Sequence, residues 1–284
     1  MSAEAPLLSF RISVDYPNRP GVLRDVHLEI KSGEILGLVG ESGSGKSTIA
    51  LALLRLLGLK GACVCGEVIF EGRDLLQTPE AQLRAIRGRR MSIVLQSPQA
   101  SLNPALRIGA QLKEAWRAHA SGTPRDCHAA ISAALYSAQL RDDAELLHSR
   151  PSQLSVGQAQ RVNIAMAILH RPALLIADEA TSALDTITQS EILDLFVQLN
   201  RELRMAILYI SHDLMSVSRL CDRVAILYTG QILEAGSTRE IFTSPKHSYT
   251  RRLLAATQTL HMREAAENAS GEPFELSDLY AIKR

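Results

Sequence analysis

A short glycine-rich segment between two apolar runs constrains the fold of this chain more than any other feature. The run Ile35–Val39 is apolar throughout, as expected of a buried strand in a parallel sheet. It leads into GESGSGKST at positions 40–48, and the apolar segment Ile49–Leu57 that follows has the length and the alanine and leucine content of a buried helix. A turn between a strand and a helix places its backbone N–H groups at the helix N-terminus, where they bind phosphate oxygens.

The turn matches the phosphate-binding pattern G-x-x-x-x-G-K-[ST] at Gly40, Gly45, Lys46 and Ser47. Lys46 is expected to reach the β- and γ-phosphates of a nucleotide, and the Ser47 hydroxyl is expected to ligate Mg²⁺. A chance glycine-rich turn is the alternative, but it would not need a strand before it and a helix after it. We therefore predict a nucleotide site that includes the whole turn: Gly40, Glu41, Ser42, Gly43, Ser44, Gly45, Lys46, Ser47 and Thr48.

Two adjacent carboxylates follow a second apolar run. Asp178 and Glu179 come directly after Leu174–Ala177, at the carboxyl end of a predicted strand, where ligands of parallel sheets bind. We expect Asp178 to hold Mg²⁺ through water and Glu179 to orient and polarise an attacking water, a role typically worth ~10²–10⁴ in rate. Alone, the pair could be the solvated acidic start of a helix; beside a phosphate loop it predicts hydrolysis.

His212 and Gln96 also follow apolar runs, Ala206–Ile210 and Met91–Leu95. We expect His212 to contact the γ-phosphate or to hold Glu179 and the water. The uncharged Gln96 amide can touch Mg²⁺ and the same water. Taken singly, a histidine is more often structural and a glutamine often caps a strand, so both assignments depend on their position at strand ends.

The segment Leu154–Gln158 predicts a second phosphate-binding device. Ser155 is a good N-cap for the apolar helix that follows, so the segment presents backbone N–H groups at a helix N-terminus. One nucleotide needs one cradle. The economical explanation is that the second cradle closes on a nucleotide held by another subunit.

The remaining pattern predicts an α/β fold. Alternating residues in the first 35 positions indicate short antiparallel strands with a turn at Asn18–Gly21, and a further strand is expected at Glu67–Phe70. Strands then alternate with helices, as in a mainly parallel sheet. The stretch from 98 to 150 is mostly helical, with Thr123 as a cap, and a periodic helix is predicted at Thr186–Leu203.

Composition excludes several classes of protein. Lys and Arg total 31 against 30 Asp and Glu, which leaves a net charge of +1, and aromatic residues are 4%; both argue against nucleic acid as a partner. No apolar run approaches the ~18 residues of a membrane span, and no signal peptide is expected. The four cysteines fit a reducing compartment, and Cys63 and Cys65 are too sparse for a metal site, so we expect small buried or loop residues there.

Together these ordered motifs, from about Leu7 to Ala256, resemble the ATP-binding subunits of ABC transporters. The resemblance implies a P-loop NTPase core with a mainly parallel sheet, an N-terminal antiparallel β subdomain and a helical signature subdomain at about 98–170. Residues 1–256 would form the ATPase domain and 257–284 a C-terminal tail. The cofactors implied are ATP and Mg²⁺.

The resemblance also implies roles that the residues alone do not give. Ser155, Gly157 and Gln158 match positions that bind ATP across a dimer, Asp185 matches the loop that links the two sites, and Tyr16 matches an aromatic ring that stacks on adenine. A strand-edge tyrosine is the rival interpretation of Tyr16. The chain departs from the family pattern in two places: Val156 replaces a glycine, so its backbone must be ordinary there, and Ala180 replaces a proline.

The segments 96–104 and 244–254 resemble the oligopeptide, dipeptide and nickel importer branch. This implies an ATPase at the cytoplasmic face of the inner (plasma) membrane that powers import of peptides, nickel or metal chelates. Its partners would be two membrane permease subunits, an identical or paralogous second ATP-binding subunit and, indirectly, a periplasmic or extracellular solute-binding protein. The alternatives are a soluble ABC ATPase in repair or translation, which the short insert at 98–150 disfavours, and a non-hydrolytic scaffold of a soluble enzyme complex, against which Glu179 and His212 argue.

Overall fold

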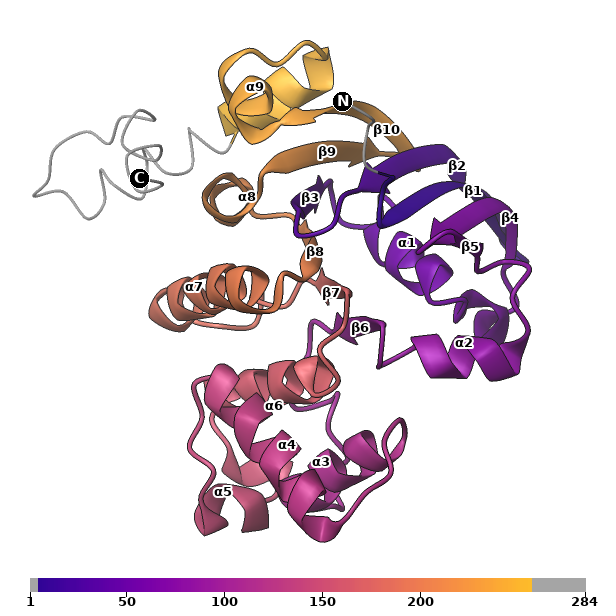
Figure 1. Cartoon of the computed structure of the whole chain (residues 1–284). Coiled ribbons are helices and arrows are strands. Elements are labelled where there is room, and N and C mark those ends of the chain that lie inside the picture. Colours follow the sequence, from indigo (N-terminus) through magenta and orange to yellow (C-terminus); the bar gives the residue numbers. More distant parts are fainter. Residues whose placement is uncertain (1–4, 257–284) are drawn as a thin grey trace, which may run out of the picture.

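The computed structural model describes residues 5–256, so the predicted tail at 257–284 lies outside the described residues. A mainly parallel sheet runs through the molecule, in the order β10-β9-β3-β8-β7-β6 (Figure 1). β3 pairs in parallel with β8 and β9, and β7 pairs in parallel with β6 and β8, whereas β10 is antiparallel to β9. The predicted α/β architecture is therefore confirmed. The strands are β3 (Ile35–Val39), β6 (Met91–Val94), β7 (Leu174–Asp178), β8 (Ala206–Ser211), β9 (Arg223–Tyr228) and β10 (Gln231–Ser237).

A separate antiparallel sheet, in the order β2-β1-β4-β5, is formed by the N-terminal third of the chain. Tyr16 pairs with Arg19, so the turn lies two residues earlier than predicted. The predicted turn includes Pro20 and the glycine after it, but both belong to β2, an edge strand, where a proline costs no ladder hydrogen bond. The strands are β1 (Leu8–Tyr16), β2 (Arg19–Ile30), β4 (Cys63–Phe70), which begins before the predicted Glu67, and β5 (Arg73–Asp74).

The first helix begins and ends earlier than its apolar composition suggested. α1 spans Lys46–Leu53 rather than 49–57, because Gly45 serves as its N-cap and Arg55 turns into the left-handed region. The other helices are α2 (Glu80–Ile86), α3 (Ile108–Arg117), α4 (Pro124–Ser137), α5 (Ala144–His148), α6 (Val156–Ile168), α7 (Thr186–Leu203), α8 (Leu214–Leu220) and α9 (Thr238–Thr243), with 3₁₀ turns at Leu57–Lys60 and Pro151–Gln153.

Helices α3, α4, α5 and α6 gather at one end of the molecule, beyond β6, and α9 lies at the other end (Figure 1). The predicted cap of α4 is present: the Asp126 backbone N–H donates to the Thr123 hydroxyl, and the Thr123 backbone N–H donates to the Asp126 carboxylate. No helix within residues 5–256 is long and apolar enough to cross a membrane.

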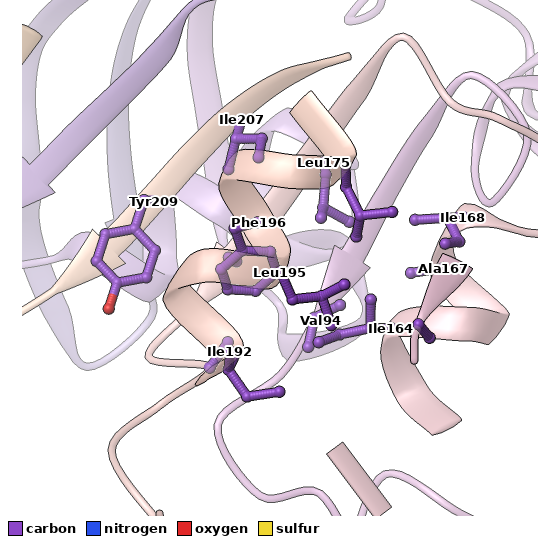
Figure 2. Close-up of a cluster of buried hydrophobic side chains, with 14 of the residues drawn as sticks. Val94, Ile164, Ala167, Ile168, Leu175, Ile192, Leu195, Phe196, Ile207 and Tyr209 are labelled. Carbon is purple, nitrogen blue, oxygen red and sulfur yellow. The ribbon is translucent and has the colours of Figure 1, made fainter. Parts of the chain in front are cut away.

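Each face of the larger sheet is buried in a separate apolar cluster. Leu36 and Leu38 of β3 face the cluster shared with α1 and the antiparallel sheet, while Ile35 and Val39 face the cluster shared with the later helices. Figure 2 shows part of the second cluster, in which Phe196 of α7 lies among strand and helix side chains. Burial on both faces explains why the strands are almost continuously apolar.

We expect Phe196→Ala to destabilise the fold by about 3–5 kcal/mol, because it removes a ring that is 0% exposed and packs edge-on against Tyr209 at 6.3 Å between centroids. The matched control is Tyr136→Ala, where the aromatic residue is 83% exposed and the loss should stay within about 0.5 kcal/mol. Denaturant unfolding of both variants measures the difference. Similar losses in the two variants would contradict this account of the core.

Candidate functional site

The phosphate-binding turn is held in a conformation that two of its glycines permit. Gly45 has φ 111°, which residues with a Cβ rarely adopt, and a Cβ there would lie 2.6 Å from Leu23. A Cβ on Gly40 would lie 2.3 Å from the Leu227 carbonyl oxygen. The turn also accepts a hydrogen bond at the Ser44 carbonyl from the Gly230 N–H, at 3.1 Å. The residues between β9 and β10 therefore support the turn from behind.

Lys46 places its charge inside this turn. Its Nζ donates to the carbonyl oxygens of Gly40 at 2.8 Å and Glu41 at 3.0 Å, and the side chain is only 4% exposed. The same Nζ lies 3.6 Å from Oε1 of Glu179. A cation fixed by backbone carbonyls in this way is preorganised to meet an anion.

Ser47 and Asp178 join the start of α1 to the end of β7. The Ser47 hydroxyl donates to Asp178 Oδ1 at 3.1 Å, and Asp178 is 7% exposed. Burial raises the pKa of Asp178, and the neighbouring charge of Glu179 adds to this, while the Ser47 hydrogen bond and Lys46 act in the opposite direction. The pair thus offers two adjacent oxygen donors, the ligand type that hard cations prefer.

Glu179 has a backbone conformation that is costly for a residue other than glycine. Its φ is 49°, a left-handed conformation that costs of order 1–3 kcal/mol. Its N–H donates to the Ile210 carbonyl at 2.9 Å, and its Oε1 lies 3.4 Å from Nδ1 of His212, which follows β8. The ends of β7 and β8 therefore bring a carboxylate and an imidazole together, as their places after two apolar runs suggested.

A pocket of about 680 Å³ opens between the phosphate-binding turn and the tip of the antiparallel sheet. Tyr16 lines it, and the Tyr16 hydroxyl lies 3.5 Å from Oγ1 of Thr48. Predicted site residues in its wall are Tyr16, Ser42, Gly43, Gly45, Lys46, Ser47, Thr48, Gln96 and Glu179; residues that the sequence analysis missed are Pro17, Asn18, Arg19, Val22 and Lys60. A basic residue close to Tyr16 in the sequence was the available signal for Arg19, whereas Lys60 lies well beyond the turn and had no comparable signal.

Nine predicted residues are not among those that line this pocket. Five of them lie in the phosphate-binding turn or at the ends of β7 and β8: Gly40, Glu41, Ser44, Asp178 and His212. The other four lie at the starts of α6 and α7: Ser155, Gly157, Gln158 and Asp185. Ser155 caps α6 in a reciprocal pair with Gln158, at 3.0 and 3.1 Å. Asp185 caps α7. Its carboxylate accepts hydrogen bonds from Thr188, and these lower the pKa of Asp185; the bond from the Thr188 backbone N–H has the largest effect, followed by the bond from the hydroxyl.

The N-termini of α6 and α7 adjoin each other. A Cβ on Gly157 would lie 2.8 Å from the side-chain methyl of Thr188, so a side chain at this position would not fit without a shift of the Thr188 side chain. Val156 begins α6 in ordinary helical geometry, as expected for a valine, and its side chain is exposed, as is that of Ile187 in α7. The two helix starts thus form an exposed surface in which apolar and capping residues are mixed.

A buried hydroxyl chain, which the sequence patterns did not indicate, lies beneath the Glu179–His212 pair. The Tyr209 hydroxyl, from β8, lies 2.9 Å from Oγ1 of Thr181 and donates to Oγ of Ser216 at 3.2 Å. Ser216 Oγ in turn donates to the carbonyl of Asp213 at 2.8 Å. Burial raises the pKa of Tyr209. The chain connects the residues that follow Glu179 to the turn that follows His212.

A tyrosine at an inward position of an otherwise apolar strand was the available signal, since a buried tyrosine usually has a hydrogen-bond partner for its hydroxyl. A second contact holds the same loop: Nε2 of Gln160, in α6, donates to the Ala180 carbonyl at 2.5 Å. The loop after Glu179 is therefore fixed from α6 as well as from β8 and α8.

Comparison with known proteins agrees with this geometry. The family model described as ABC transporter matches residues 23–182. The glutathione import ATP-binding protein GsiA of Salmonella paratyphi A is 42% identical over 244 residues, which are 84% of this chain and 39% of that protein. The chain thus spans about two fifths of the length of that relative.

The probable peptide ABC transporter ATP-binding protein y4tR of Sinorhizobium fredii is 42% identical over 82% of this chain and 70% of its own length. Among solved structures, the dimeric post-hydrolysis state of the ATP-binding cassette MJ0796 bound to ADP and Pi aligns with a TM-score of 0.70, at 26% identity, over 82% of this chain and 99% of that one. These matches confirm the resemblance inferred from the motifs: the chain belongs to the ABC transporter family, and its fold is that of an ATP-binding cassette.

Proposed function

We propose that this chain is the ATP-hydrolysing subunit of an ABC importer for peptides or similar small solutes. One observation carries the proposal: the Glu179 carboxylate stands between Nζ of Lys46 and Nδ1 of His212, at 3.6 and 3.4 Å, in the wall of the pocket beside the phosphate-binding turn. A fixed cation, a carboxylate and an imidazole at one point can stabilise the charge that develops on a phosphate and orient an attacking water.

ATP would bind with its phosphates in the turn and its adenine on Tyr16. The pocket volume of about 680 Å³ lies within the usual range for small-molecule sites. Backbone N–H groups at the start of α1 and the Lys46 ammonium would hold the phosphates. Arg19 and Lys60, in the same wall, add positive charge around a polyanionic ligand.

The donor set fits Mg²⁺. Ser47 and Asp178 are held 3.1 Å apart, and Gln96 lines the same pocket, so these residues are the ones we propose to hold the cation. When bound, Mg²⁺ supplies positive charge that offsets the charge of the β- and γ-phosphates. It would also favour the ionised form of Asp178, whose pKa burial raises.

Glu179 is the residue we propose to orient the attacking water, by accepting a hydrogen bond from it. His212 would keep the carboxylate in place and contact the γ-phosphate. The left-handed conformation of Glu179 supports this role, since strained backbone concentrates at functional sites. Tyr209 is a positioning residue in this scheme: it holds Thr181 and Ser216, and through them the two loops that carry Glu179 and His212.

Ser155, Gly157, Gln158 and Asp185 would act on the nucleotide of a second ATP-binding subunit, identical or paralogous. Their absence from the wall of the described pocket and the exposed side chains beside them support this. A solved relative with this fold is a dimer bound to ADP and Pi.

The other partners follow from the names of the relatives, which are import and peptide-transport ATP-binding proteins. We propose that the chain is peripheral to the inner membrane, at its cytoplasmic face, bound to two permease subunits and served indirectly by a solute-binding protein. Peptides are favoured over nickel or metal chelates by those names. No observation favours a soluble repair or translation ATPase.

We expect Glu179→Gln to retain ATP binding but to lower hydrolysis by at least ~10²-fold, because the amide cannot accept the proton of water. Size-exclusion chromatography with Mg-ATP should then detect a trapped dimer. Lys46→Ala, in contrast, should lose ATP binding. Glu145→Gln, on the exposed surface of α5, is the matched control. A Glu179→Gln chain that remains monomeric and hydrolyses ATP normally would refute the assigned role.

Tyr16→Ala should weaken ATP binding by about five- to a hundredfold, the equivalent of ~1–3 kcal/mol for an aromatic ring stacked on a base. Tyr16→Phe should retain most of the affinity, since the ring remains. Titration with a fluorescent ATP analogue compares the two. Equal losses would mean that the hydroxyl contact to Thr48, and not the ring, is what matters.

Tyr209→Phe should lower kcat for ATP about ten- to a hundredfold and leave KM nearly unchanged, because small displacements of Glu179 or His212 slow hydrolysis without altering the pocket wall. Tyr136→Phe, at an exposed position, is the control. Steady-state kinetics on the folded variants separates kcat from KM. An unchanged kcat would show that the hydroxyl chain supports only the fold.

A further inference from the structure

Two exposed thiols lie side by side on the antiparallel sheet, outside the wall of the pocket described above. Cys63 and Cys65 are two positions apart on β4, so their side chains emerge on the same face. Both are exposed, and their sulfur atoms are 3.8 Å apart. The expectation that Cys63 and Cys65 are small buried or loop residues was therefore wrong, because β4 begins at Cys63, four residues before the start of the predicted strand at Glu67.

The two thiols are not equivalent. In the register with β1, Cys63 lies opposite Asp15 and Cys65 lies opposite Ser13. The contact with Cys63 raises the pKa of Cys65 most, and the charge of Asp15 adds to it. The close contact of the two sulfur atoms thus favours the protonated form of Cys65.

We propose that Cys63 and Cys65 form a dithiol site that a low-molecular-weight disulfide converts reversibly to an intramolecular disulfide bond. The thiolate of one cysteine attacks one sulfur of the small disulfide, forms a mixed disulfide and releases one small thiol. The other cysteine then loses its proton and attacks the cysteine sulfur of the mixed disulfide, which closes the bridge and releases the second thiol. The two cysteines are oxidised, and the small disulfide is reduced to two thiols.

The strand geometry permits the bridge but strains it. Two residues of a strand span about 6.4–6.8 Å between Cα atoms, at the upper end of the range of ~4.4–6.8 Å for disulfides. β4 can bend here, because the described part of the chain has no strand paired with its outer side at these residues; β5 meets only Ile69 and Phe70. A strained, exposed disulfide is easily reduced, which makes the bridge reversible.

The position of Cys63 and Cys65 connects their redox state to the pocket lined by Tyr16. This connection rests on the proposed function. Asp15, opposite Cys63, accepts a hydrogen bond from the Gly21 N–H at 2.5 Å and precedes Tyr16, which lines the pocket. Shortening β4 between Cys63 and Cys65 pulls on Asp15. We therefore expect the bridged chain to bind ATP a few-fold more weakly than the dithiol chain.

To test this, the full chain is incubated with oxidised and reduced glutathione at set ratios. The remaining thiols are then alkylated, and the intact mass of the chain is measured. The expected result is a loss of about 2 Da that maps to one peptide containing both residues and reverses with excess thiol. Cys63→Ser and Cys65→Ser should each lack the bridge and retain one glutathione adduct. The buried Cys127 and Cys221 should remain unmodified in the folded chain.

The proposal is overturned if no bridge forms at any ratio, if the bridge joins two chains, or if it involves Cys127 or Cys221. Equal ATP affinity of the bridged and dithiol chains would overturn the connection to the pocket. The two proposals fail in different measurements. Failure of the bridge to form is detected by mass, whereas failure of the proposed ATP site would appear as a lack of ATP binding by the dithiol chain itself.

Discussion

The parallel register of β3, β7 and β8 is the constraint on which the rest of the structure depends. Val39 pairs with Ser211, and Asp178 pairs with Ile210, so the three strands end at one edge of the sheet. A slip of one residue would turn each buried side chain to the opposite face, and both faces are filled by apolar clusters. Packing of the core therefore fixes the position of the polar residues that follow each strand.

Those polar residues are then arranged by local electrostatics. Lys46 is almost fully buried, but backbone carbonyls and the Glu179 carboxylate surround its charge. Asp178 has one hydroxyl donor, and burial raises its pKa. A site with one satisfied cation and one buried carboxylate beside a hydroxyl suits a ligand that combines negative phosphates with a divalent cation, which is the basis of the function proposed above.

The sequence predicted what depends on local spacing. The phosphate-binding turn, the polar residues at strand ends and the caps at Thr123 and Ser155 follow from short patterns with a direct physical meaning. It did not predict what depends on tertiary partners. The hydroxyl chain of Tyr209 joins residues 28 and 7 positions away, and the left-handed backbone of Glu179 has no sequence signal, since glutamate is not a residue that favours it.

The backbone of Glu179 has a consequence for how this chain balances stability against activity. Glycine would adopt φ 49° there without steric strain, so at this position the backbone conformation favours a residue that lacks the carboxylate. Selection for relief of this backbone strain alone would thus replace the side chain that we propose to act on water. Stabilising this protein by consensus or computational redesign must hold position 179 fixed, because the strain there accompanies the proposed chemistry rather than a defect of the fold.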